Sequence, residues 1–150
     1  MKVRIDVRED CEEEIVIKCR KADEDILRIR QYIMDMPQKM PDITYYKENH
    51  HEYYMPVGDV MFFETDDETV YAHTADDAYR VKFKLYELEN FLPADFVRIS
   101  KSTIINVRHI NSIERNIASA SLIKFYESYK QVYVSRFYYK NLKQRLKERR

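Results

Sequence analysis

The chain has 150 residues, with 26 basic and 26 acidic side chains, 45% hydrophobic residues and a single glycine, Gly58. This length suits one compact domain with a hydrophobic core, or a small module fused to a second one. A mean hydropathy of -0.64 and the lack of an apolar run near 20 residues argue against a membrane-spanning segment. With one glycine, neither the G-x-G-x-x-G dinucleotide loop nor the G-x-x-x-x-G-K phosphate loop can be written.

The balanced total charge conceals two opposite halves. Residues 1–95 hold 13 basic and 23 acidic side chains, a net charge of −10, whereas residues 96–150 hold 13 and 3, a net charge of +10. Such a basic stretch is typical of a surface that binds a polyanion, because lysine and arginine displace condensed counterions from phosphates. The alternative is that the acidic half pairs with the basic half, and charge alone does not separate the two interpretations.

The first part of the chain predicts a small α+β module. Alternating apolar residues predict strands, and apolar residues at helical spacing, ended by Pro37, predict a helix. The expected elements are strands at residues 2–7 and 14–20, a helix at 23–36 and a hairpin of 43–47 with 52–55. We therefore place a domain boundary between residues 1–55 and 56–150.

The second part predicts a mainly β domain. Acidic turns separate its first three strands, and Pro93 ends the first of its two helices. Strands are expected at residues 60–64, 69–73, 79–83, 96–99, 103–106, 110–115, 121–126 and 131–134, and helices at 84–92 and 135–150. Many short antiparallel strands with few helices indicate an α+β fold that is mainly β.

Catalysis and metal binding find little support in the sequence. The four histidines lack the spacing of a zinc motif, and Cys11 and Cys19 have no second pair, so free thiols are expected. Two acidic turns would suit a hard cation if their tips were adjacent, and their residues are Asp66, Asp67, Glu68, Asp76 and Asp77. Solvated turns are the simpler interpretation. We expect no enzymatic activity, no metal, no cofactor and no small-molecule substrate.

Two short polar and basic segments between predicted elements carry chemistry suited to nucleic acid. Ser100, Lys101 and Ser102 offer one cation and two hydroxyls, which match phosphates and base edges. Arg136 follows a predicted N-cap, Ser135, at a helix N-terminus that can itself meet a phosphate. We predict base contacts from Lys101 and Arg136. Residues expected to contact phosphate or support the loops are Arg98, Ser100, Ser102, Thr103 and Lys140, although Arg98 could equally pair with a carboxylate.

Four blocks of the sequence resemble the LytTR-type DNA-binding domain family. The most specific is Phe96–Asn106, FVRISKSTIIN, which resembles the family's F-x-R-I-H-R-S-Y-I-V-N. The other blocks are Gly58–Glu64 (compare D-I-x-Y-I-E), Leu85–Pro93 (L-x-E-L-E-x-x-L-P) and Val134–Leu142 (V-S-R-x-Y-x-x-x-L). They occur in the family's order and together cover about residues 56–147.

This resemblance implies a bacterial transcription regulator with an elongated fold of antiparallel sheets, which contacts DNA through loops rather than a recognition helix. Carried over by position, the loops are residues 66–69, 100–103 and 135–140. Arg136 matches the family's closing arginine, and Ser100 replaces its common histidine. The first loop departs most from the family, because Asp67 and Glu68 would repel phosphate.

About 55 residues precede the resemblance, fewer than a receiver domain needs, so the chain resembles short, receiver-free members of the family. In some of these a small membrane protein encoded alongside controls the regulator. The start of the chain has no apolar signal region, so we expect a cytoplasmic protein. We expect residues 1–55 to form a homodimer that presents two DNA-binding domains, or to act in regulation.

The function expected is sequence-specific binding of double-stranded DNA. The alternative is a non-enzymatic protein-interaction module in which the acidic half masks the basic half. The DNA interpretation requires Lys101 and Arg136 to be exposed on the same side of the folded domain.

Overall fold

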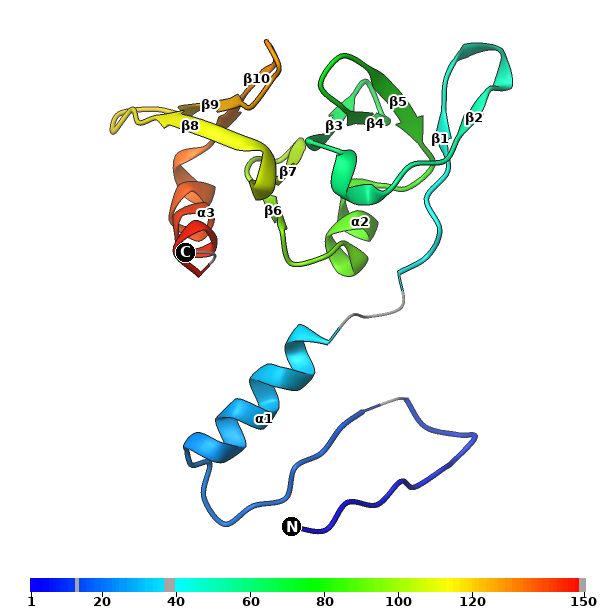
Figure 1. The fold of residues 1–150 in the computed structure, drawn as a ribbon, viewed down its shortest axis with the longest axis vertical. Helices are drawn as coiled ribbons and strands as arrows, with labels where there is room; N and C mark the ends of the chain where they lie inside the picture. The colour runs from blue at the N-terminus through cyan, green and yellow to red at the C-terminus, as the bar shows by residue number, and fades with distance from the viewer. Residues whose placement is uncertain (13, 37–39, 149–150) are drawn as a thin grey trace. The chain divides into compact units, whose positions relative to one another are not determined.

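The computed structural model describes residues 1–12, 14–36 and 40–148, and the chain divides into two compact units, Met1–Met36 and Pro37–Arg150 (Figure 1). Helix α1 (Glu24–Asp35) is the only regular element among the described residues of the first unit. The carboxylate of Asp23 caps it by accepting a hydrogen bond from Ile26 N at 3.0 Å. The predicted helix is confirmed. No helix in the described ranges is long and apolar enough to cross a bilayer.

The two strands predicted at residues 2–7 and 14–20 are wrong, because the structure contains no strand among these residues. The side chains of Val3, Ile5 and Val7 are 88%, 88% and 87% exposed. A strand needs a neighbour that takes up its backbone hydrogen bonds and covers its apolar face. In the described part of the first unit nothing provides either, so the alternating pattern does not form a sheet.

The second unit is built from two antiparallel sheets (Figure 1). The larger sheet has the strand order β2-β1-β5-β4-β3-β7-β6, and the smaller has the order β10-β9-β8. The strands of the larger sheet are β1 (Tyr45–Tyr46), β2 (Glu52–Tyr53), β3 (Phe62–Asp66), β4 (Thr69–His73), β5 (Ala78–Val81), β6 (Phe96–Arg98) and β7 (Thr103–Asn106). Those of the smaller sheet are β8 (Ile110–Glu114), β9 (Ser121–Phe125) and β10 (Gln131–Val134).

Helices α2 (Leu85–Phe91) and α3 (Arg136–Glu148) and three short 3-10 turns complete the described part of this unit. The turns are η1 (Glu48–His50), η2 (Val57–Asp59) and η3 (Val107–His109). The expected α+β fold, mainly β, is confirmed, and the strands and helices predicted after residue 56 form within a few residues of their predicted bounds. The last two positions of the predicted helix 135–150 lie outside the described residues.

The predicted tyrosine-rich hairpin also forms, with Tyr45 opposite Tyr53 in the β1–β2 pair. We assigned this hairpin to the module of residues 1–55. In the structure it is part of the larger sheet, because Tyr46 of β1 pairs with Arg80 of β5.

Two apolar cores lie on opposite faces of the larger sheet. Phe63 and Ile104 belong to the core covered by α2, whereas Phe62 and Ile105 belong to the core shared with the smaller sheet and α3. Successive side chains of a strand point to opposite faces, so the paired strands β3 and β7 are buried on both sides. These central strands, buried on both faces, carry the loops at their ends.

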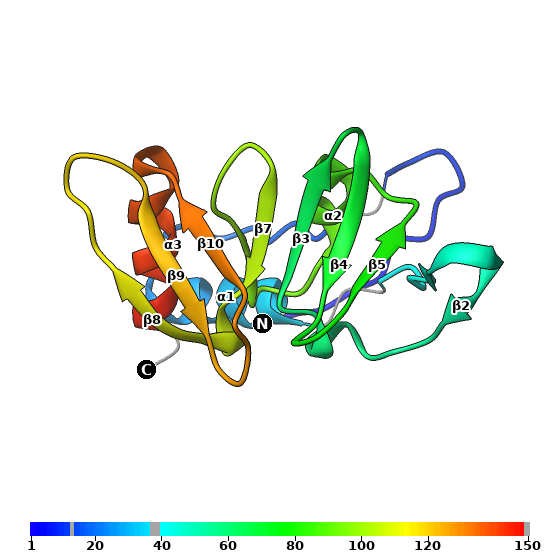
Figure 2. The same ribbon diagram turned by 90° about the horizontal axis from the view of Figure 1, so that it is seen from above.

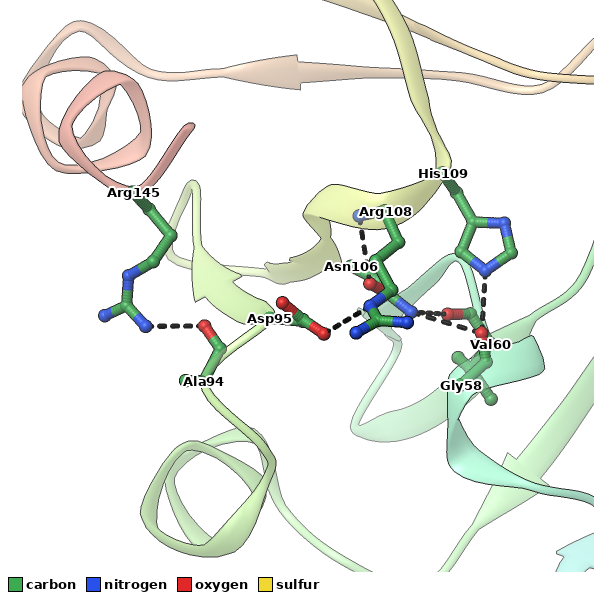
Figure 3. Close-up of polar contacts among 8 residues, drawn as sticks. All are labelled: Gly58, Val60, Ala94, Asp95, Asn106, Arg108, His109 and Arg145. Atoms are coloured by element: carbon green, nitrogen blue, oxygen red, sulfur yellow. Dashed lines mark hydrogen bonds and ion pairs between the residues drawn. The ribbon is translucent and has the colours of Figure 1, made fainter. Parts of the chain in front are cut away.

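Asn106, the last residue of β7, forms hydrogen bonds at the junction between the two sheets (Figure 3). Its Nδ2 donates to the carbonyl oxygens of Gly58 at 3.2 Å and Val60 at 3.1 Å, and its Oδ1 accepts from Arg108 N at 3.1 Å. The Arg108 side chain then pairs with Asp95, with 2.6 Å between Nε and Oδ2. The side chain of Asn106 is completely buried, so this asparagine is a structural element of the family-like block.

Two further side chains attach neighbouring segments to the same junction (Figure 3). The ring of His109 approaches the Gly58 carbonyl, with 2.7 Å between Nε2 and the oxygen. Arg145, near the end of α3, donates to the carbonyl oxygen of Ala94 at 2.5 Å. The orientation of α3 is therefore fixed at its C-terminal half by the loop that precedes β6.

Candidate nucleic-acid interface

Three segments far apart in the sequence meet at one edge of the second unit. Thr65 N donates to Ser102 O at 2.8 Å, which attaches the end of β3 to the β6–β7 loop. Ser135 N donates to Ile99 O at 2.9 Å, which attaches the start of α3 to the other side of that loop. Figure 2 shows the β3–β4 turn, the β6–β7 loop and the β10–α3 junction along its upper side. We call this the loop edge, and define it as residues 66–69, 100–103 and 135–140.

Arg98 holds the β6–β7 loop in shape. Its guanidinium donates to the carbonyl oxygens of Ser100, at 2.7 Å from Nε, and of Lys101, and it pairs with Glu89 at 2.9 Å. Only 16% of the Arg98 side chain is exposed. The carboxylate pairing that the sequence left open for Arg98 is therefore present, and with all three guanidinium nitrogens engaged this residue supports the loop from within.

The three hydroxyl residues of the loop differ in their exposure. Ser102 is exposed and Ser100 is half-buried, and Ser100 Oγ accepts from Ser102 N at 3.2 Å in a tight local turn. Thr103 is only 3% exposed, and its hydroxyl lies 3.4 Å from Glu64 Oε2. Ser100 and Ser102 remain accessible to a ligand, whereas Thr103 packs within the sheet.

Arg136 and Lys140 lie at the N-terminal end of α3, one helical turn apart, and both are exposed. Ser135 precedes them at the predicted N-cap position, where its Oγ lies 3.4 Å from Tyr138 N. A helix N-terminus carries unpaired N–H groups and a partial positive charge, which attract anions. The first turn of α3 therefore adds to the positive potential of these two side chains.

Lys101 and Arg136 lie on the same side of the unit, because the Ile99–Ser135 backbone bond joins their loops and both side chains are exposed. Among the residues that the structure describes, neither they nor Lys140 form an ion pair within 4.0 Å. The geometric condition that we set for the DNA interpretation is met, and three cations of the loop edge remain free to meet an anionic ligand.

The β8–β9 loop also reaches this side of the unit (Figure 2), although we did not predict a contact from it. Arg115 in this loop lies over the ring of Tyr139, with 3.4 Å between its Cζ and the ring centroid. This cation–π contact holds an exposed guanidinium beside the first turn of α3. The sequence analysis placed Arg115 at the end of a predicted strand, residues 110–115, whereas in the structure β8 ends at Glu114 and Arg115 begins the loop.

The β3–β4 turn brings negative charge to the loop edge. Asp66 pairs with Thr69, so Asp67 and Glu68 form a two-residue turn, and their φ angles are 49° and 68°. Both carboxylates are exposed. As expected from the sequence, this turn is unfavourable for phosphate, and its backbone conformation favours asparagine or glycine rather than glutamate.

At the ends of the strands opposite the loop edge, which we call the opposite edge, hydrogen bonds join the two sheets. Lys130 Nζ, after the β9–β10 turn, lies 3.2 Å from His73 Nδ1 and donates to Asp77 O. Ser128 Oγ donates to Ala75 O at 2.8 Å. Burial and the nearby Lys130 charge lower the pKa of His73 to about 4, so His73 is neutral and accepts the hydrogen bond from Lys130.

The two acidic turns lie at opposite ends of β4, since one closes at Thr69 and the other at His73. Our premise that they form two adjacent tips is therefore wrong, because consecutive turns of an antiparallel meander lie at opposite ends of its strands. The second turn is also engaged: Asp77 pairs with Lys47, and this hydrogen bond lowers the pKa of Asp77. A joint cation site of these turns has no geometric basis.

Comparison with known proteins gives a consistent result. The sequence model of the LytTR family, described as the LytTr DNA-binding domain, matches residues 50–147. The chain belongs to the LytTR family. Two relatives are proteins of Staphylococcus aureus strains NCTC 8325 and MRSA252, each described as an uncharacterized HTH-type transcriptional regulator. They are 31% and 30% identical to this chain over 138 residues, which is 91% of this chain and 91% of each relative.

The LytTR fold is also found in a solved structure. A chain described as the LytTr DNA-binding domain of a putative methyl-accepting/DNA response regulator from Bacillus cereus superposes with a TM-score of 0.63 and 27% identity. The match covers 71% of this chain and 97% of that chain. The family resemblance read from the four sequence blocks is thus confirmed.

Proposed function

We propose that this LytTR protein is a transcriptional regulator that binds specific sequences of double-stranded DNA through its loop edge. The main support is the pair of exposed cations, Lys101 and Arg136, which lie on one side of the unit without ion-pair partners among the described residues. The order of elements also favours loops as the contact, because α1, α2 and α3 are each separated by strands and none follows another directly. We further propose that it has no enzymatic activity and acts in the cytoplasm, where a bacterial chromosome lies.

Within this proposal the loop-edge residues have different tasks. Lys101 and Arg136 contact base edges, since lysine and arginine donate well to the O6 and N7 atoms of guanine. Ser100, Ser102 and Lys140 contact phosphates. Arg98 and Thr103 keep the β6–β7 loop in position from the interior, as their hydrogen bonds with Ser100, Lys101 and Glu64 suggest. These last two residues act on affinity through the shape of the loop.

The experiment is a fluorescence anisotropy titration against two duplexes, one enriched from a random library by the wild-type chain and one with the same bases scrambled. Lys101→Ala and Arg136→Ala are each expected to weaken binding to the enriched duplex by about 5- to 150-fold, and to weaken scrambled-duplex binding far less. Wild-type affinity should fall steeply between low and high salt. Lys124→Ala is the matched control, because Lys124 pairs with Glu114 on the smaller sheet, away from the loop edge.

The rival function, a protein-interaction module with a masked basic half, predicts a different result. In that case the wild-type chain binds neither duplex at any salt concentration, and no sequence is enriched from the library. Equal losses for both duplexes in the Lys101 and Arg136 variants would instead leave DNA binding intact but contradict base readout by these residues.

We also propose that residues 1–36 provide the homodimer contact. Val3, Ile5 and Val7 alternate along a segment where they are almost fully exposed, and α1 has no buried residue. Pairing with a second copy would cover this apolar surface and place two loop edges on one DNA site. Control by a small membrane protein, which the family resemblance implies for some short members, stays a prediction.

A further inference from the structure

Phe137 is the most exposed aromatic side chain among the described residues, with 84% of its surface accessible. It is the second residue of α3 and lies beside Arg136 at the loop edge. Single exposed apolar residues are common on protein surfaces. This one is unusual in its setting, because Arg136 precedes it and Lys140 follows about one helical turn later, and we assign both cations to DNA contact.

The ring of Phe137 has a defined support. It packs edge-on against Tyr138, with 5.0 Å between ring centroids and an interplanar angle of 83°. Tyr138 in turn packs on the core shared by the two sheets. Phe137 also lies near the start of the exposed surface of α3, which continues with Lys140, Asn141, Lys143, Gln144, Lys147 and Glu148. A supported aromatic ring at the tip of a polar and basic helix face is suited to touch whatever the helix N-terminus approaches.

The surroundings favour a nucleic-acid base over an apolar protein partner. Arg136 and Lys140 flank Phe137, and Lys101 lies on the adjoining loop, so a partner must tolerate a high positive charge. The major groove of DNA offers phosphates for the cations and, on thymine, a methyl group that phenylalanine can contact. No other exposed aromatic residue of the described chain lies in the loop edge as defined.

We propose that Phe137 reads sequence by packing against the C5 methyl group of a thymine in the major groove, next to the guanine bound by Arg136. This inference rests on the proposed DNA-binding function and adds a specificity contact to it. Arginine and phenylalanine at consecutive positions would then read two neighbouring base pairs.

The experiment replaces each thymidine of the enriched duplex, one at a time, by deoxyuridine, which removes only the methyl group. At least one thymine of the site is expected to show a loss of about fourfold with the wild-type chain, the effect of one buried methyl group. With Phe137→Ala the same replacement should have no effect, while affinity for the thymine duplex falls by at least that factor. Phe137→Leu should retain part of the discrimination.

Tyr129→Ala is the matched control, because Tyr129 is 81% exposed in the β9–β10 connection at the opposite edge. It should leave the deoxyuridine profile unchanged. The inference is overturned if Phe137→Ala binds like the wild-type chain, or if deoxyuridine costs the same in both proteins, which would indicate a contact elsewhere, such as a protein interface. In either case the library still enriches a sequence, and Lys101→Ala and Arg136→Ala still weaken binding. If no sequence is enriched and these variants have no effect, the proposed function itself is refuted.

Discussion

At the scale of single residues, Asn106 shows how a family-like block can be structural rather than functional. Its amide group makes three hydrogen bonds that link β7, η2 and η3 without access to solvent. The same block contains Arg98, whose interactions hold the loop that carries Lys101. Charged or polar residues in such a block thus support the exposed residues between them.

Asn106→Ala is expected to lower the free energy of unfolding by about 2–4 kcal/mol, because it removes three hydrogen bonds and leaves the carbonyl group of Val60 and the N–H of Arg108 without their partner. Urea denaturation followed by circular dichroism measures this loss. Asn90→Ala is the control, since Asn90 is exposed on α2 and should change stability by less than about 0.5 kcal/mol. Equal stability of the two variants would contradict the structural role of Asn106.

At the scale of elements, the β3–β4 turn combines an unfavourable backbone with an unfavourable charge. The sequence Asp67-Glu68 occupies a turn in which both residues have positive φ. Asn-Gly is the sequence that this two-residue turn prefers. The turn therefore offers a substitution that should improve stability and duplex affinity together.

The double variant Asp67→Asn, Glu68→Gly is expected to raise the free energy of unfolding by about 1 kcal/mol, because it relieves the two positive φ angles. At low salt it should also bind duplex DNA more tightly, since two carboxylates leave the loop edge, and this gain should shrink as salt rises. Thermal melts and anisotropy titrations measure the two effects. Asp76→Asn, in the turn at the opposite edge, should leave duplex affinity unchanged; an equal gain there would show that only net charge matters.

At the scale of the whole molecule, the second unit is held together at two edges by different chemistry. The loop edge depends on backbone hydrogen bonds between loops, and the opposite edge depends on Lys130, which bridges to His73 and Asp77. His73 also stacks on Phe62, with 4.3 Å between ring centroids. The contact at the opposite edge therefore requires a neutral histidine.

The pKa of His73 is about 4 in the folded protein and near its ordinary 6.5 in the unfolded chain. Between these values the unfolded chain binds more protons, so His73 favours folding above pH 6.5 and this contribution is lost as pH falls to 4. The wild-type chain should lose about 3 kcal/mol more than His73→Phe between pH 7 and pH 4. Urea denaturation at several pH values measures both curves, and parallel curves would contradict a neutral, buried His73.

The homodimer proposal also belongs to this scale. The triple variant Val3→Ser, Ile5→Ser, Val7→Ser is expected to convert the dimer to a monomer, because these side chains are exposed in the described part of the first unit and pairing with a second copy would cover them. Light scattering after size-exclusion chromatography measures the mass. The melting temperature of the second unit should not change. A wild-type monomer at every concentration tested would refute the dimer.

Much of the second unit could be predicted from local patterns. The Leu85–Pro93 block specified α2, and short alternating segments separated by acidic turns specified β3, β4 and β5. These signals are local, because periodicity and turn residues act through neighbours in the chain. The same reasoning was wrong for residues 2–7, where alternation exists but the partner strand does not.

Sequence by itself determined the family and the mainly β fold, and it identified Lys101 and Arg136 as candidate contacts, since each follows from residue order or from charge. Only the tertiary structure decided that Arg98 and Thr103 face inward, that Arg115 joins the same side, and that the acidic turns lie at opposite ends of β4. These outcomes depend on hydrogen bonds and packing between segments distant in the chain, such as Ile99 with Ser135. Such contacts leave no periodic signal in one sequence.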